Sequence, residues 1–449
     1  MSAFQEADFD ECLGVLSQHE GTAGQALRVR CLLRMGRAPD ALRILDDADF
    51  TNMSHRCAAE LLIVRIAAYI MIDDGDGARR SIAEAKARSY GVGSVELESE
   101  LMYSSALLEW TVGNHAAAKE LALALLSNHS SIPAWLRENV DSYPYSRGYW
   151  RARSFELLGM TAGLEKDFQT QAAHLMNAFE EFDSASCRDA LVEGVMLANL
   201  AVLVRDLQDP RITEFVRARL PKISASAALA HWRFQIQHSI GWCSALAGDH
   251  LGGLREFRQS AEIAPSIPLR IRAILDRAFI AGQLSEKYFA LEQLEHACQL
   301  ASSIDWDSVV SHDRSILLQL AMAIAPYDAV RARAMLDRHA SVRAPISKLS
   351  MFAQDRRQRG EDCMAIATVV RAEGQLDRAT MLFKEALDIW TDVGYAWRAA
   401  AAAIEIYTLT GDTAYLDVVA REAAERPRSW IASRYAAVVL DDPKTFVRA

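Results

Sequence analysis

The stretch from Phe234 to Pro265, FQIQHSIGWCSALAGDHLGGLREFRQSAEIAP, decides the fold. Its informative positions, at the offsets of a helix, a tight turn, a second helix and a stop, are Gly241, Gly248, Phe257 and Pro265. A second copy runs from Gly360 to Trp390, and its corresponding positions hold Ala367, Val370, Gly374, Ala379, Phe383 and Ala386. Glycine permits a sharp turn, and small residues let two helices approach closely. The two copies therefore predict antiparallel helix pairs joined by short turns.

This pattern resembles the tetratricopeptide repeat, a helix pair with a period of about 34 residues. The resemblance implies an all-α fold, an α-solenoid in which stacked antiparallel helix pairs form a right-handed superhelix. It also implies that the first helix of each pair lines a concave groove. Because a repeat array grows by stacking, the 449 residues measure the number of repeats rather than the number of globular domains.

The other parts of the chain follow the pattern to different degrees. Four further segments match it well, at 22–53, 56–89, 96–128 and 395–427. Four others are helical by apolar period but match the repeat positions poorly, at 150–183, 189–220, 269–304 and 312–339. Interruptions at 127–148 and 340–361 are either breaks in the superhelix or long loops between repeats. We therefore expect N-terminal repeats at 1–140, central degenerate repeats at 141–345 and C-terminal repeats at 346–449.

Composition narrows the class of protein. Hydrophobic residues make up 51% of the chain and only 11 residues are Pro, which favours an ordered, packed chain. The formal charge of -10 disfavours general binding to nucleic acid or to an anionic membrane. Seven scattered Cys without a Cys-x-x-Cys pair indicate reduced thiols, and the acidic N-terminus lacks the order of a secretory signal. The longest apolar run, 61–72, is too short to span a bilayer. We expect a cytoplasmic protein.

Short motifs for catalysis are missing from the sequence. It contains no phosphate-binding loop, no His-Glu-x-x-His helix and no Gly-x-Ser-x-Gly elbow. His231 and His238 lie seven residues apart, which on a helix is a rise of about 10.5 Å, too far to share a zinc ion. The sequence therefore predicts no catalytic residue, no metal site and no cofactor, although a site built on these histidines and acidic neighbours is a third alternative for function.

The candidate partner-binding residues come from the resemblance. Its groove-facing positions correspond here to Arg30, Arg34, Tyr103, Trp110, Gln235, His238, Trp242 and Arg371. Arginine and large aromatic residues are effective anchors, because they fork onto carboxylates or bury much area. Packing between repeats is the alternative for each of them. The dense Lys and Asn clamp that some relatives use for a C-terminal carboxylate is missing.

Two further segments are candidates for interaction. Aromatic residues cluster around Tyr145 and Trp150, next to Arg147, and they either contact a partner or plug the superhelix itself. Basic residues outnumber acidic ones between Arg331 and Arg359, which indicates either a site for an acidic or phosphate-bearing partner or a solvated helix face.

These features predict a non-enzymatic scaffold that binds a protein or peptide in its groove. The alternative is a regulatory or sensor protein, because the last quarter, from Gly374 to Trp430, is weakly similar to the helical-repeat regions of bacterial LuxR-type transcriptional regulators. Those regulators also carry an ATPase domain and a helix-turn-helix, and the sequence shows neither. Any regulation would therefore act through a bound partner or ligand.

Overall fold

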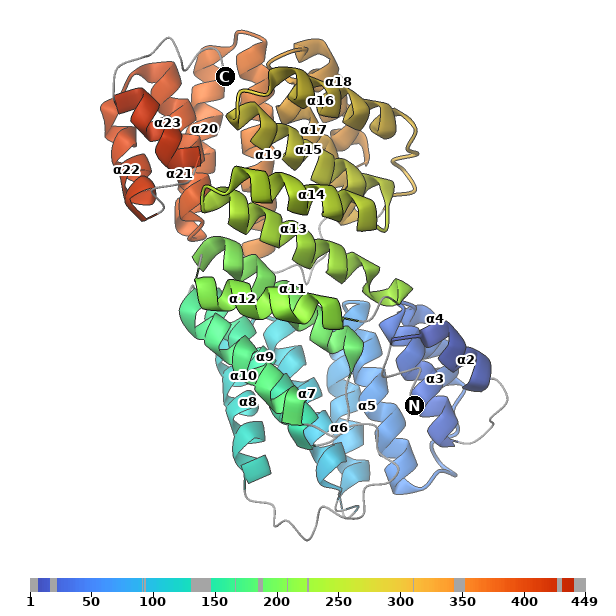
Figure 1. Cartoon of the computed structure of the whole chain (residues 1–449). Coiled ribbons are helices and arrows are strands. Elements are labelled where there is room, and N and C mark those ends of the chain that lie inside the picture. The colour runs from blue at the N-terminus through green and yellow to red at the C-terminus, as the bar shows by residue number, and fades with distance from the viewer. Residues whose placement is uncertain are drawn as a thin grey trace. The chain divides into compact units, whose positions relative to one another are not determined.

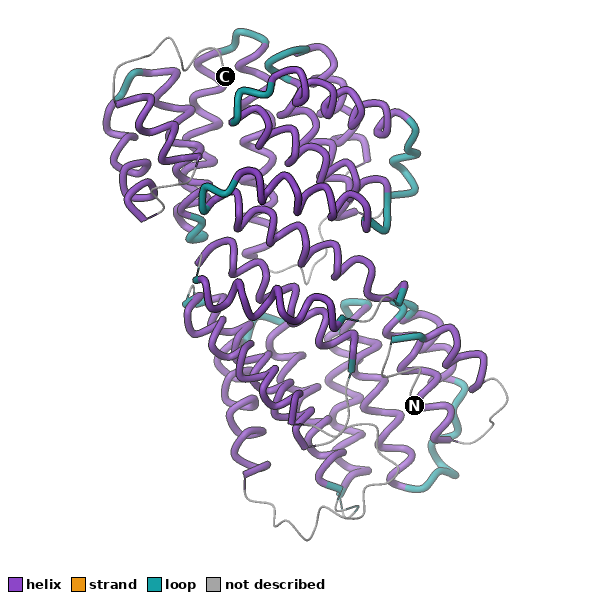
Figure 2. The backbone as a smooth tube through the Cα atoms, in the orientation of Figure 1, coloured by secondary structure: helices purple, strands orange, loops and turns teal. Residues whose placement is uncertain are grey.

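All regular structure that can be described in this protein is helical. The computed structural model describes residues 7–16, 22–90, 92, 94–130, 147–165, 167–184, 189–207, 209–223, 226–309, 311–342, 352–425 and 430–439. Within these residues no strand occurs, as the tube in Figure 2 shows. The all-α prediction is confirmed. Tyr145 lies outside the described residues.

The described residues of the N-terminal half form a short helix followed by five helix pairs (Figure 1). The short helix is α2 (Phe9–Leu16). The five pairs are α3 (Thr22–Arg34) with α4 (Ala38–Asp46), α5 (His55–Met71) with α6 (Gly75–Ser89), α7 (Val95–Thr111) with α8 (His115–Ser130), α9 (Arg147–Leu164) with α10 (Phe168–Ser184), and α11 (Ala190–Leu207) with α12 (Pro210–Arg219).

The C-terminal half repeats this arrangement. Its pairs are α13 (Ala230–Leu246) with α14 (His250–Ile263), α15 (Ile267–Gln283) with α16 (Lys287–Ser302), α17 (Ile316–Ile324) with α18 (Ala329–Val342), α19 (Phe352–Ala372) with α20 (Leu376–Asp392), and α21 (Ala396–Thr410) with α22 (Leu416–Glu425). A last helix, α23, spans Trp430–Val439. Short 3-10 turns lie at 220–222, 227–229, 311–315 and 413–415. The segments that match the repeat poorly are therefore also helical, as predicted.

Many of the turns inside the pairs share one backbone design. One residue is left-handed and donates its N–H to the carbonyl three residues back, and the next residue donates to the carbonyl five residues back. The left-handed residue is Gly36, Gly113, Gly248 or Gly374 in four of these turns. Asp73 and Ser285 take the same position in two others, each with φ 64°. The Cβ atom of a residue other than glycine makes this conformation costly.

Ser285→Gly should therefore stabilise the protein. Ser285 is exposed, so little packing is lost, and relief of the left-handed strain should raise the free energy of unfolding by about 1 kcal/mol. The midpoint of urea unfolding measures this change. Gly248→Ala is the matched control, because it creates the strain that Ser285→Gly removes and should shift the midpoint in the opposite direction. An unchanged or lower midpoint for Ser285→Gly would contradict the explanation.

Close approach of the two helices explains the glycines in the two clear repeat copies. A Cβ atom at Gly241 would lie 2.8 Å from Cε1 of Phe257, whose ring is fully buried. At Gly360 a Cβ atom would lie 2.7 Å from Cζ2 of Trp390, which is also buried. A large ring on the second helix thus packs against the backbone of the first. These contacts explain why the repeat pattern is clearest at these two places.

The chain divides into two compact units, and the boundary falls inside α11. The N-terminal unit holds the described residues up to Leu200 together with 221–229, and the C-terminal unit holds the remainder. Each unit has its own buried core of alanine and branched aliphatic side chains between the helix layers. The division of the sequence into three segments stays a prediction.

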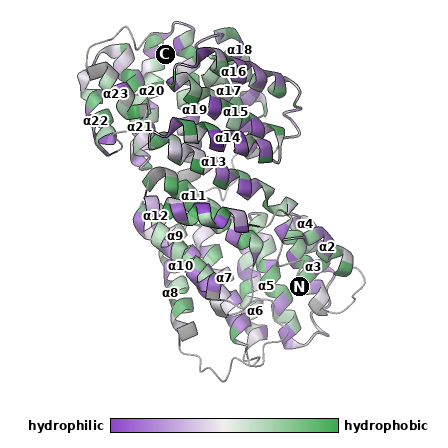
Figure 3. Cartoon of the chain, viewed as in Figure 1, coloured by the Kyte–Doolittle hydropathy of each residue, from purple (hydrophilic) through white to green (hydrophobic). Residues whose placement is uncertain are grey.

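The described helices mix polar and apolar residues along their length, as Figure 3 shows. Among them, none combines the length and the apolar character that crossing a membrane requires. The apolar run at 61–72 instead lies almost wholly within α5, where Leu61, Leu62, Ile63 and Ile66 are buried. This confirms its interpretation as a buried repeat helix.

The basic stretch between Arg331 and Arg359 is largely ion-paired. Its described pairs join Arg331 to Glu295, Arg333 to Glu373, Arg338 to Asp307, Arg356 to Asp392 and Arg359 to Glu385. The last two connect α19 with α20, because α19 already begins at Phe352 and extends into the region interpreted from the sequence as an interruption. Acidic residues on neighbouring helices and turns therefore offset the excess of positive charge.

Candidate functional site

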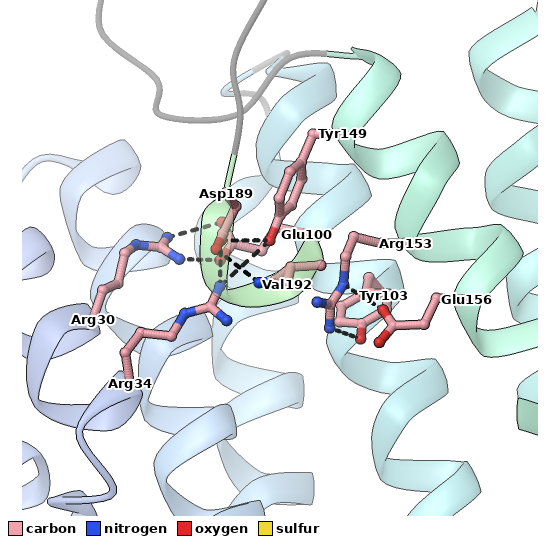
Figure 4. Close-up of polar contacts among 9 residues, drawn as sticks. All are labelled: Arg30, Arg34, Glu100, Tyr103, Tyr149, Arg153, Glu156, Asp189 and Val192. Atoms are coloured by element: carbon pink, nitrogen blue, oxygen red, sulfur yellow. Dashed lines mark hydrogen bonds and ion pairs between the residues drawn. The ribbon is translucent and has the colours of Figure 1, made fainter. Parts of the chain in front are cut away.

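The first helices of the N-terminal unit bring two predicted arginines together with acidic partners. Arg30 and Arg34 lie one turn apart on α3 and point toward Glu100 and Asp189 (Figure 4). Arg30 binds both carboxylate oxygens of Glu100 on α7, with Nη2 2.9 Å from Oε2. Nη2 of Arg34 lies 2.8 Å from Oδ2 of Asp189, which directly precedes α11. Both carboxylates are at least nine-tenths buried.

Asp189 also positions the start of α11. Its Oδ1 accepts a hydrogen bond from the backbone N–H of Val192 at 3.1 Å, which satisfies a free donor of the first turn. The hydroxyl of Tyr149 lies 3.5 Å from its Oδ2. Arg34 and Asp189 belong to the first and the fifth helix pair and are 155 residues apart. The unit must therefore curl with its first helices inward, and these residues lie on the inner face.

A second polar group lies beside the first on the same inner face. Arg153 of α9 stacks over the ring of Tyr103 on α7, with Cζ 4.6 Å from the ring centroid, and also binds its hydroxyl. Nε of Arg153 lies 3.1 Å from Oε2 of Glu156, one turn further along α9. Tyr103 and Glu156 are buried and Arg153 is largely so, and the three side chains form one cluster.

Burial changes the proton affinities in this cluster. It raises the pKa of Glu156, while the adjacent Arg153 acts in the opposite direction. It also raises the pKa of the Tyr103 hydroxyl, again opposed by Arg153. Burial lowers the pKa of Arg153, but Glu156 and Tyr103 outweigh this and move it above its usual range. Arg153 therefore stays charged and Tyr103 stays neutral at physiological pH.

Two further predicted aromatic residues of this unit are buried or partly buried. Trp150 is buried and packs edge-on to Tyr149, with centroids 5.0 Å apart, and 6.0 Å from Tyr103. Trp110 is partly buried at the end of α7 and faces His115 at 6.3 Å. A role for these residues in partner binding stays a prediction, as it does for Tyr145.

In the C-terminal unit, two predicted residues share one carboxylate. Nε2 of His238 lies 2.5 Å from Oδ2 of Asp276 on α15, and the indole N–H of Trp242 donates to the same oxygen at 3.0 Å. Gln235 lies one turn before His238 on α13 and is partly buried. Asp276 therefore joins α13 to α15 through both side chains.

Trp242 also makes the closing contact of this unit. Its ring stacks on Trp397 of α21 with centroids 5.8 Å apart and an interplanar angle of 29°. Phe257 and Phe279 pack against its other sides. As in the N-terminal unit, a first helix thus meets the fifth pair, here through apolar rings.

The last predicted residue, Arg371 of α19, forms an ion pair with Glu405 of α21. Glu405 is shared with Arg434 of α23, which lies 3.4 Å away. The Arg371 side chain is 29% exposed, and that of Arg34 is 24% exposed. These two arginines therefore keep part of their surface open to water.

Sequence reasoning missed most of the acidic partners. Glu100 and Tyr103 have the same spacing on their helix as Gln235 and His238, and so do Arg153 and Glu156. Comparison of the helix pairs position by position could therefore have found Glu100, Arg153 and Glu156. No comparable pattern in the sequence marks Asp189 or Asp276. The described residues contain no group of three or more His, Cys, Asp or Glu side chains suited to a metal ion.

Comparisons with known proteins identify the fold and no family. No protein-family profile matches the chain, and a search of curated protein sequences found no match. Among solved structures, the chain is similar to the apo form of RapI, with a TM-score of 0.55 and 11% identity over 83% of this chain and 98% of that one. The TPR-like helical-repeat fold, expected from Phe234–Pro265, is thereby confirmed.

Two other similarities have lower scores. The apo form of the quorum sensor NprR from B. thuringiensis matches with a TM-score of 0.48 and 12% identity, over 82% of this chain and 97% of that one. A Rap protein complexed with competence and sporulation factor matches with a TM-score of 0.41 and 11% identity, over 82% and 99%. At such identities a similarity concerns the fold alone, and these two scores are too low to indicate more.

Proposed function

We propose that this protein is a non-enzymatic helical-repeat scaffold that binds a protein or peptide partner along the inner face of its first helices. The observation that carries the proposal is the set of arginine and tryptophan side chains on the first helices. Arg34 and Arg371 are partly exposed there, and Trp110 is partly buried. Arginine and tryptophan are the residue types that contribute most at protein interfaces.

The array itself also favours binding. Its helix pairs are held together by buried cores in each unit, so the inner face is ordered before a partner arrives. Little conformational entropy is then lost on association. The weak C-terminal resemblance to LuxR-type regulators belongs to the same proposal, since a scaffold whose partner controls transcription would be its regulatory form.

Panning a random-peptide library against the whole chain tests this function. For the peptides recovered, Trp110→Ala or Arg371→Ala should weaken binding about 10- to 30-fold, the loss that removal of an interface anchor causes. Calorimetric titration measures the dissociation constant, and far-ultraviolet circular dichroism confirms that each variant stays helical.

Matched controls lie on the second helices. Arg258 on α14 and Tyr288 on α16 are highly exposed, and their replacement by alanine should leave the affinity unchanged. If no peptide binds, or if both inner-face variants bind as tightly as the two controls, the proposal fails.

A further inference from the structure

The two halves of the chain have matching helices in the same order. Helices α5 and α15 are each 17 residues long, and so are α10 and α20. Helices α12 and α22 are each 10 residues long and both end their fifth pair. Other helices differ in length, for example α7 with 17 residues and α17 with 9, so the pairs α3 to α12 and α13 to α22 correspond in their order and in these three helices.

Special backbone positions match as well. The left-handed residues Asp73 and Ser285 each stand second after the end of their helix, α5 or α15, and have the same φ of 64°. Ser54 and Ser266 directly precede the same two helices, and both cap them through the side-chain oxygen. Such turns and caps are separate requirements of the local chain. The same turn position recurs in other pairs, and Ser94 caps α7 likewise, but only Asp73 and Ser285 place a residue other than glycine at that position in the described turns within pairs. The second pair of each half therefore corresponds, and we call the five pairs of each half a module.

Buried side chains occupy the same positions along α10 and α20. Counted from the first residue of each helix, Leu175, Ala178, Phe179 and Phe182 correspond to Phe383, Ala386, Leu387 and Trp390, and all eight are buried. The two modules therefore use equivalent core positions with different side chains.

Each module also has a contact between its first helix and its fifth pair. Arg34 and Trp242 both lie on the first helix of their module, and Asp189 and Trp397 both lie at the start of the first helix of the fifth pair. The joint between the first helix and the fifth pair is made by an ion pair in the N-terminal module and by stacked indoles in the C-terminal module. We propose that this joint is a latch, and that the N-terminal latch opens in solution while the C-terminal latch stays closed.

The chemistry of the two contacts supports the difference. When an ion pair opens, both charges regain the hydration that burial removed, so the net free-energy change is small. Arg34 is already 24% exposed, so water reaches its guanidinium. Separation of Trp242 from Trp397 instead exposes apolar area that water solvates poorly. The N-terminal module therefore has the lower barrier to uncovering its inner face.

Opening of the latch would affect the proposed binding of a partner, because it uncovers the inner face of the N-terminal module. If a partner binds this inner face, it reaches the N-terminal part of the face when the latch is open, and a larger open population raises the apparent affinity in proportion. This step rests on the proposed function, whereas the opening itself does not. The opening is therefore measured without any partner, so that failure of one proposal leaves the other standing.

Distance measurement between spin labels tests the latch in the whole chain. Labels on noncanonical residues replace Arg43 on α4 and Glu180 on α10 in the N-terminal module, and the equivalent Arg255 on α14 and Asp388 on α20 in the C-terminal module. All four positions are exposed. We expect a broad distance distribution with an open population for the N-terminal pair and one narrow distance for the C-terminal pair.

Two perturbations then separate the latches. Asp189→Asn keeps a good helix cap and removes the charge, and should enlarge the open N-terminal population about threefold or more. Raising the salt from about 0.1 M to about 1 M, which shortens the Debye length from about 10 Å to about 3 Å, should do the same without any mutation. The C-terminal distance should respond to neither and should broaden only in Trp397→Ala.

An N-terminal distance that stays narrow under both perturbations would overturn the proposal. Equal broadening of the two modules by salt would also overturn it, because the latches would then not differ. The salt titration of the unmodified latch keeps the test valid if Asp189→Asn reduces the amount of folded protein.

Discussion

Phe257→Ala should lower the free energy of unfolding by about 3–5 kcal/mol, the cost of removing a fully buried phenylalanine from a core. Its ring fills the space beside Gly241 and also contacts His238 and Trp242. The shift of the urea midpoint at constant slope measures the loss. Leu251→Ala, on the same helix but 66% exposed, is the control and should cost less than about 0.5 kcal/mol.

A double-mutant cycle shows whether the glycine and the ring act together. Gly241→Ala alone should cost about 1–3 kcal/mol, because the new methyl group collides with Phe257 although alanine favours helices. In combination with Phe257→Ala the methyl group enters the vacated space, so the double variant should be more stable than the sum of the single losses predicts. Additive losses would show that the close approach is not what selects glycine at this position.

Glu100→Ala should destabilise the N-terminal unit by about 3–5 kcal/mol, the effect expected when one member of a buried ion pair is removed. The carboxylate is 8% exposed and holds the Arg30 guanidinium, which is 11% exposed, across two helix pairs. Without it the arginine loses its bidentate partner where water enters poorly. Urea unfolding measures the change in the whole chain.

The matched control is Glu98→Ala on the same helix. Glu98 is exposed, and its replacement should change stability by less than about 0.5 kcal/mol. The combined change Arg30→Met with Glu100→Leu should recover most of the loss, since an apolar pair of similar volume often replaces a buried ion pair at no cost. If Glu100→Ala is as mild as Glu98→Ala, the pair does not hold α3 to α7.

The features of the fold that could be predicted are those that depend on contacts within a single helix pair. Gly241, Gly248 and Phe257 lie within one helix pair, and their packing depends only on the geometry of that pair. The segment at 269–304 resembled the repeat poorly because its turn uses Ser285 where others have glycine, and because Leu294 stands where the clear copies have a phenylalanine. Its helical period was sufficient to predict α15 and α16.

The site was predictable only in part, for a physical reason. The groove-facing positions that the repeat resemblance implies are local to each first helix, and they pointed to Arg30, Arg34, His238 and Trp242. Their partners lie up to 155 residues away and meet them only because small rotations between successive pairs accumulate into a curve. The size of each rotation depends on side-chain packing between neighbouring pairs, which the repeat pattern does not specify. Asp189 and Trp397 therefore could not be assigned from the sequence.

Two contacts depend on the rotation summed over the helix pairs of each half: Arg34 with Asp189, and Trp242 with Trp397. Each meeting occurs only when four steps of rotation have added up to the right angle. With one pair inserted, the first helix and the last pair of a half would pass each other, and with one pair deleted they would not meet. The closing contact therefore requires a particular number of helix pairs in each half. In a repeat array without such a contact, the number of pairs can vary.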